Sequence, residues 1–141
     1  MKSNLRKILA ALSVVIATPQ FATADEALYE DYLSKHKDKS FCVGMGSVLA
    51  SDYLEEMIET VGEDTAIRIM DIESANNKGL FENIMAAMLD NNMNKIWKRR
   101  FEINIIKIQA DAIIQGWEHA TNSVEVLGIE KAAENYIEDC E

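Results

Sequence analysis

The chain has 141 residues, of which 48% are hydrophobic, and carries 24 acidic against 14 basic side chains. This length suits one domain with a single core. The net charge of −10 disfavours nucleic acid and anionic membrane surfaces as partners, because both repel an acidic protein. One proline and six glycines are too few for the turns of a β-rich chain, so the composition predicts an all-α protein.

Residues 1–24 are typical of a secretory signal peptide. A basic start is followed by the ten-residue apolar run Ile8–Ala17 and by Ala22-Thr23-Ala24, an A-x-A cleavage site. The alternative is a membrane anchor, but ten residues are too few to span a bilayer, which needs about 20. We therefore expect a signal peptide at 1–24 and a single helical domain at 25–141, located in the periplasm or, alternatively, secreted.

The expected mature domain is more acidic than the whole chain. It loses three basic residues and no acidic ones, so residues 25–141 carry a net charge of −13. Such a charge attracts cationic proteins over long distances. The alternative interpretation is that the charge serves solubility alone.

The domain is predicted to begin with a short helix over 25–33, in which Asp25 lies at the positive end of the helix dipole. The charged run 35–39 is interpreted as an exposed connection, which would make His36 a solvated loop residue rather than a ligand. Ser40 is the predicted N-cap of a second helix that continues to about Val61.

The second helix contains the stretch Phe41–Ala50, which has one hydroxyl and no charge. Apolar residues fall on every side of this stretch, so we expect it to be buried all round. Gly44 and Gly46 each cost a helix about 1 kcal/mol relative to alanine. The favoured reason for these glycines is close approach of a neighbouring helix, with flexibility at a functional site as the alternative. Gly62 is predicted to end the helix.

The end of this helix carries a stripe of acidic residues that no lysine or arginine interrupts. Its members are Asp52, Glu55, Glu56, Glu59 and Glu63. The stripe is either a solvated face or a docking surface for a basic partner protein, and these five residues are the candidate partner-binding site.

The next segment is predicted to hold two helices that are separated by a turn at Asn76–Gly79. The methionine-rich face that follows is expected to be adaptable core, with a promiscuous groove as the alternative. The residues of that face are Leu80, Phe81, Ile84, Met85, Met88 and Leu89.

The longest helix is predicted over Met93–Ala120 and has two apolar faces. One face comprises Trp97, Phe101, Ile105, Ile108 and Ala112, and the other comprises Ile103, Ile106, Ala110, Ile113 and Trp117. A helix that is apolar on two sides is packed on two sides, so we expect it at the centre of a bundle of four to six helices. Thr121-Asn122-Ser123 is expected to end it and to cap the last helix.

The two cysteines are Cys42 and Cys140. Two cysteines in an exported chain usually pair, so an intramolecular disulfide is predicted. Two free thiols and an intermolecular bridge are the alternatives. No C-x-x-C motif is present, which makes thiol–disulfide catalysis an unsupported role.

The sequence contains none of the motifs that mark common catalytic sites. G-x-S-x-G, H-E-x-x-H, the P-loop and the dinucleotide fingerprint are all absent. Two histidines and two pairing cysteines also make a poor set of metal ligands. We therefore expect a protein that is not an enzyme and has no catalytic residue, no metal and no cofactor.

Phe41-Cys42-Val43-Gly44, which follows a signal peptide and continues into an apolar helix, resembles the F-C-x-G-like helix start of the type VI secretion amidase immunity proteins, the Tai/Rap group. Cys140 matches the cysteine that many members carry near the C-terminus. The resemblance implies a periplasmic helical protein that binds a cell-wall hydrolase and blocks its active site. The alternatives are a periplasmic stress chaperone and a non-catalytic, envelope-associated protein. No stable membrane insertion is expected, and an oligomer is left open.

Overall fold

The computed structural model describes residues 24–141, and every regular element within that range is an α-helix. The predicted signal peptide lies outside the described residues, except for Ala24. The five helices in this range are α2 (Ala24–Ser51), α3 (Leu54–Val61), α4 (Glu63–Leu89), α5 (Lys95–Leu127) and α6 (Ile129–Cys140). The predicted all-α fold is confirmed. None of these helices is long and apolar enough to cross a membrane.

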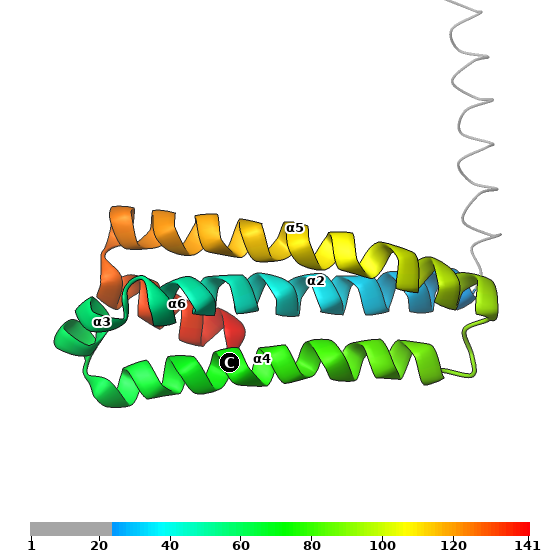
Figure 1. Ribbon diagram of the computed structural model, residues 1–141, viewed down its shortest axis with the longest axis horizontal. Helices are drawn as coiled ribbons and strands as arrows, with labels where there is room; N and C mark the ends of the chain where they lie inside the picture. The colour runs from blue at the N-terminus through cyan, green and yellow to red at the C-terminus, as the bar shows by residue number, and fades with distance from the viewer. Residues whose placement is uncertain (1–23) are drawn as a thin grey trace, which may run out of the picture.

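The central helix is α2, not the longest helix as predicted. Figure 1 shows α2 between α5 and α4, with α6 beside one half of the bundle and α3 at its end. Both α4 and α5 pack mainly on α2 and hardly touch each other. The all-apolar stretch explains this position, because α2 is buried on every side around Met45 and Leu49.

The first predicted connection is wrong, because α2 runs through residues 35–39 without a break. His36 lies on the inner side of α2 and is fully buried, while Lys35 and Lys37 lie on the outer side of α2 and are exposed. Ser40 is not an N-cap: it lies inside α2 and donates a hydrogen bond from Oγ to the His36 carbonyl oxygen at 2.7 Å. A helix needs only one buried stripe, so a charged run does not end it.

The predicted turn at Asn76–Gly79 is also wrong, since α4 is continuous there. The Asn76 amide donates to the carbonyl oxygen of Ile72 at 3.0 Å and to that of Cys140 at 3.1 Å. Gly79 leaves room for the Lys39 side chain, whose Nζ would lie 3.0 Å from an added Cβ. The residues that resembled a turn therefore serve contacts between helices.

Two further differences from prediction concern helix ends: one predicted helix is divided into two, and the longest helix extends further than predicted. The helix expected over 40–61 is divided, because α2 ends at Ser51 and α3 begins at Leu54. The longest helix continues past Thr121–Ser123 to Leu127, and Gly128, with φ of 88°, precedes α6. Gly62 ends α3 as predicted, with φ of 93°. Positive φ values favour glycine, so both sharp junctions fall where a glycine is available.

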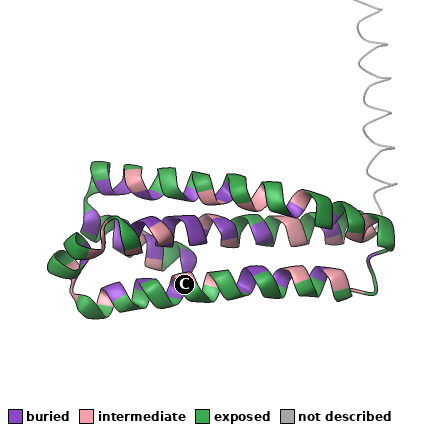
Figure 2. Cartoon of the chain, viewed as in Figure 1, coloured by how far each residue is buried: buried purple, intermediate pink, exposed green. Residues whose placement is uncertain are grey.

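The domain has two hydrophobic clusters, one at each end of α2, and Figure 2 marks the buried residues along that helix in purple. The larger cluster joins all five described helices around Tyr136, and the smaller one centres on Phe101. The disulfide between Cys42 and Cys140 lies in the larger cluster and links α2 to the end of α6, with the two Cα atoms 5.6 Å apart. The predicted intramolecular bridge is confirmed.

The glycines of α2 allow close helix packing, as predicted. A Cβ on Gly44 would overlap the carbonyl oxygen of Ile113, and a Cβ on Gly116 of α5 would overlap that of Phe41. Gly46 faces the ring of Tyr136 on α6. The α2–α5 contact is therefore a backbone-to-backbone approach in which Gly44 and Gly116 both take part.

A polar network crosses the interior at His36. Its Nε2 lies 3.0 Å from Oε1 of Gln109, and its Nδ1 lies 3.4 Å from Nδ2 of Asn83. Because Gln109 offers an acceptor and Asn83 a donor, these contacts fit a neutral imidazole protonated at Nε2. Burial lowers the pKa of His36, and the hydrogen bond to Gln109 partly opposes that shift.

We expect the free energy of unfolding to fall as the pH is lowered from 7.5 to 5.5. Below the unfolded-state pKa of about 6.5, the unfolded chain binds a proton at His36 that the folded chain binds less readily. His36→Gln should flatten this part of the pH profile, as measured by urea unfolding at each pH. His119→Gln, at an exposed histidine, is the matched control for the loss of a histidine, and His36→Gln should flatten the profile more than it does. Equal slopes for wild type and His36→Gln would contradict the assignment.

Candidate functional site

The short helix α3 presents carboxylates to solvent at one end of the bundle. Met57 is its buried anchor and is fully inaccessible to solvent. Glu55, Glu56 and Glu59 are exposed around that anchor. The burial of Met57 in the cluster that also holds the disulfide fixes these carboxylates on a packed support.

The five predicted acidic residues lie on three elements instead of one helix. Glu55, Glu56 and Glu59 are on α3, whereas Glu63 begins α4 after the turn at Gly62. Asp52 precedes α3 and lines a separate groove beside Trp117. All five are exposed, and within residues 24–141 none of them forms an ion pair. The charge of this surface therefore remains uncompensated.

A groove of about 370 Å³ lies where α3, α4 and α6 meet. Its lining residues are Thr60, Val61, Thr65, Glu130, Ala133, Glu134 and Ile137. The lining combines apolar side chains with two carboxylates, a combination that suits the aliphatic stem and cationic head of lysine or arginine. Lys131 offsets part of the charge, because its Nζ lies 3.6 Å from Oε2 of Glu134.

We call the surface formed by Glu55, Glu56, Glu59 and Glu63 together with this groove the acidic corner. Sequence reasoning missed its α6 members, Glu130 and Glu134, because they lie far along the chain from α3. The acidic outer face of the last helix was the available signal. Only the packing of α3 against α6 brings the two acidic segments together.

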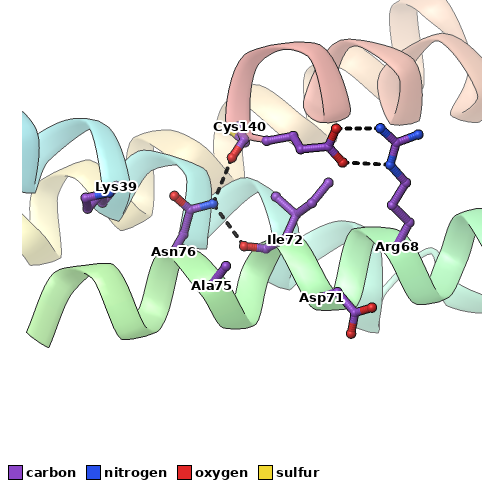
Figure 3. Close-up of a pocket in the computed structure, with 8 residues that line it drawn as sticks. Lys39, Arg68, Asp71, Ile72, Ala75, Asn76 and Cys140 are labelled. Atoms are coloured by element: carbon purple, nitrogen blue, oxygen red, sulfur yellow. Dashed lines mark hydrogen bonds and ion pairs between the residues drawn. The ribbon is translucent and has the colours of Figure 1, made fainter. Parts of the chain in front are cut away.

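A third groove, of about 430 Å³, lies beside the end of α6 and is shown in Figure 3. Arg68 reaches Glu141 there, with Nε 2.7 Å from Oε2, and this hydrogen bond lowers the pKa of Glu141. The amide of Asn76 contacts Cys140 in the same view. The polar groups of this groove therefore fasten the end of α6 to α4, and Arg68 is already occupied by a partner within the chain.

Two faces that were predicted to be core are exposed. On α4, Phe81 is 65% exposed and Leu89 is 69% exposed, so the methionine-rich face is only partly core. On α5, Ile103 is 63% and Ile106 is 76% exposed, so this part of the second apolar face is not core, whereas Ile113 is half-buried and its carbonyl oxygen faces Gly44 of α2. The prediction failed because α2 occupies the centre and leaves the outer sides of α4 and α5 uncovered.

A basic cluster at the start of α5 is partly engaged within the chain, and its residues are Lys95, Lys98, Arg99 and Arg100. Arg99 pairs with Glu102 at 2.9 Å. The guanidinium of Arg100 stacks on the rings of Tyr29 and Trp97, at 5.5 and 5.1 Å from their centroids. Arg99 therefore pairs with an acidic neighbour on its own helix, whereas Arg100 contacts aromatic rings. Within residues 24–141, Arg100, Lys107 and Asp111 form no ion pair with one another.

The fold and the acidic corner define a disulfide-linked helical protein with a negative surface at one end, which Lys131 offsets only at Glu134. No protein-family model, no curated protein and no solved structure matches the chain. Within residues 24–141, no group of three or more His, Cys, Asp or Glu side chains is placed to hold a metal ion.

Proposed function

We propose that this chain is a non-catalytic, protein-binding protein of the periplasm, most concretely an immunity or inhibitor protein that neutralises a secreted cell-wall-degrading effector. The observation that carries the proposal is the acidic corner. Its carboxylates come from α3, α4 and α6, and those of α3 have no ion-pair partner within the described residues.

The partner that fits this surface is a cationic protein. Uncompensated carboxylates accelerate the encounter with a positively charged partner and orient it. The groove then offers apolar contacts with Val61 and Ile137 and a charge contact with Glu130. A lysine or arginine side chain of the effector would occupy that groove, and the bound immunity protein would cover the active site of the effector.

Two further features support this function. A disulfide is typical of proteins in oxidising compartments such as the periplasm. The segment Phe41–Gly44, which resembles the Tai/Rap immunity proteins, contains both a disulfide cysteine and the glycine that contacts α5. In the structure this segment lies inside α2 and not at the start of a helix as the resemblance implies, and its roles there are to bond α6 and to pack on α5.

Co-purification from periplasm tests the proposal. The full chain, expressed with its own signal sequence, should recover a hydrolase or toxin at near-stoichiometric levels in low salt. The double variant Glu55→Lys/Glu59→Lys should recover at least about tenfold less, because like charges then oppose the partner.

The matched control is Glu30→Lys/Asp38→Lys, which changes the net charge equally at exposed positions of α2. This variant should retain the partner. Failure of the wild-type chain to recover any near-stoichiometric protein would overturn the function. Equal losses in both double variants would instead show that net charge, and not the acidic corner, governs binding.

A periplasmic stress chaperone is the second candidate, and the exposed face of α4 favours it. Phe81, Met85 and Leu89 form an uncovered apolar surface of the adaptable kind that binds varied clients. A chaperone would suppress the light scattering of client proteins during an acid shift. Phe81→Ser should weaken that suppression, and unchanged scattering in the presence of the wild-type chain would exclude this function.

A further inference from the structure

The outer face of α5 carries an apolar seam that no helix of the described chain covers. We call it the α5 seam, and its residues are Ile96, Ile103, Ile106, Ala110, Ile114 and Trp117, all of them exposed. Their separations of seven, three, four, four and three residues are those of a helix that packs lengthwise on another helix. At 1.5 Å per residue the seam is about 32 Å long.

The charges of α5 are divided between its two halves. Before Gln109 the helix carries five basic residues and one acidic residue, Glu102. After Gln109 it carries Asp111, Glu118 and Glu125 and no lysine or arginine. The two halves of one helix therefore complement each other in charge, provided that the helix meets a copy of itself running in the opposite direction.

We propose that the α5 seam is the interface of a two-fold symmetric homodimer, in which α5 packs antiparallel on α5 of a second copy. Suppose that the two-fold axis passes beside α5 at the level of Gln109. A residue that lies a given number of positions before Gln109 in one copy then faces the residue that lies the same number of positions after Gln109 in the other copy. Lys107 and Asp111 are each two residues from Gln109, and Arg100 and Glu118 are each nine residues away. One register thus sets both basic residues opposite acidic residues of the second copy.

Three of these four charges are available for the second copy, whereas the guanidinium of Arg100 lies over the rings of Tyr29 and Trp97. Lys107, Asp111 and Glu118 are exposed and form no ion pair within residues 24–141. At 100° per residue they share one flank of the seam with Arg100. A parallel arrangement would set the basic halves side by side, and their repulsion would disfavour it. The antiparallel pairing is isologous and closes as a dimer.

The dimer would place its two acidic corners at opposite ends. In Figure 1, α3 lies at the end of the bundle where α5 finishes, so reversing α5 in the second copy reverses the position of α3. The α5 seam lies outside the acidic corner. Dimerisation can therefore succeed or fail independently of the proposed immunity function.

Sedimentation equilibrium of residues 25–141 at about 100 µM tests the dimer. The wild-type domain should have twice the mass of one chain. Ile106→Asp should weaken the dimer at least 100-fold, because it buries a carboxylate in the seam. Phe81→Asp is the matched control, an equally drastic change at an exposed residue of α4, and it should remain dimeric. A monomeric wild type at this concentration would overturn the proposal.

A charge exchange tests the register. Lys107→Asp should weaken the dimer about tenfold or more, because two carboxylates then face each other across the interface. Adding Asp111→Lys in the same chain should restore the wild-type dissociation constant, because each pair then regains opposite charges. Failure of the double variant to bind more tightly than Lys107→Asp alone would refute the antiparallel register. Circular dichroism of each variant shows whether the domain is folded.

Discussion

Removing the disulfide by the double substitution Cys42→Ala/Cys140→Ala is expected to lower the free energy of unfolding by about 4 kcal/mol. The two cysteines are 98 residues apart in sequence, so the bridge closes a loop that spans nearly the whole domain. Chain-entropy estimates for a loop of about 100 residues give about 4 to 5 kcal/mol of stabilisation. Urea unfolding of the oxidised wild type and of the variant, followed by far-ultraviolet circular dichroism, measures the difference.

The wild-type chain in excess reductant is the control, since it loses the bridge without losing either sulfur atom. It should unfold at nearly the same urea concentration as the double variant. Partner affinity should fall with stability, because the disulfide lies in the hydrophobic cluster that holds Met57 beneath the acidic corner. A loss of stability below about 1 kcal/mol, or affinity that survives reduction intact, would show that the bridge does not support this surface.

Gly44→Ala and Gly116→Ala are each expected to destabilise the domain by about 2 to 3 kcal/mol. At both positions the added Cβ would meet a backbone carbonyl oxygen of the facing helix, that of Ile113 or that of Phe41. Backbone atoms cannot turn aside as a side chain can, so α2 and α5 must separate along their contact. The penalty exceeds the roughly 1 kcal/mol by which alanine is favoured over glycine in a helix.

Gly79→Ala is the matched control for these two substitutions. Its Cβ would meet only the side chain of Lys39, which is flexible and can move. The gain in helix propensity should then make this variant as stable as the wild type or slightly more stable. If all three glycine variants unfolded at the same urea concentration, the close approach of α2 and α5 would not be a determinant of stability.

The helical class, the disulfide and the tightly packed glycine of α2 could be predicted from local sequence. Phe41–Ala50 has no charge, which indicates burial on all sides, and it is this property that makes α2 the centre of the bundle. Gly44 signalled a close neighbour because a glycine inside a helix is costly unless packing requires it.

The continuity of α2 and α4 could not be predicted, because it depends on residues distant in sequence. Residues 35–39 and Asn76–Gly79 carry the composition of loops, yet His36 is satisfied by Gln109 and the amide of Asn76 by Cys140. Tertiary hydrogen bonds of this kind overcome weak local preferences. They become visible only when the helices are placed side by side.

The candidate site could be predicted only in part, because some of its residues are also distant from one another in sequence. The acidic residues of α3 form a run that can be recognised locally, whereas Glu130 and Glu134 join them only through the packing of α6 on α3. The apolar residues of α5 were recognised, but their periodicity is the same for a core face and for an interface with a second copy. The exposure of Ile103 and Ile106 in the folded chain excludes a core face.

Inhibition of a partner enzyme is the most direct test of the proposed function. The hydrolase recovered by co-purification would be purified separately and assayed for clearing of a cell-wall suspension while increasing amounts of residues 25–141 are added. We predict that clearing stops at one chain per enzyme, that Glu30→Lys/Asp38→Lys inhibits equally well, and that Glu55→Lys/Glu59→Lys needs at least about tenfold more protein. Undiminished clearing at a large excess of the wild-type chain would contradict the immunity function.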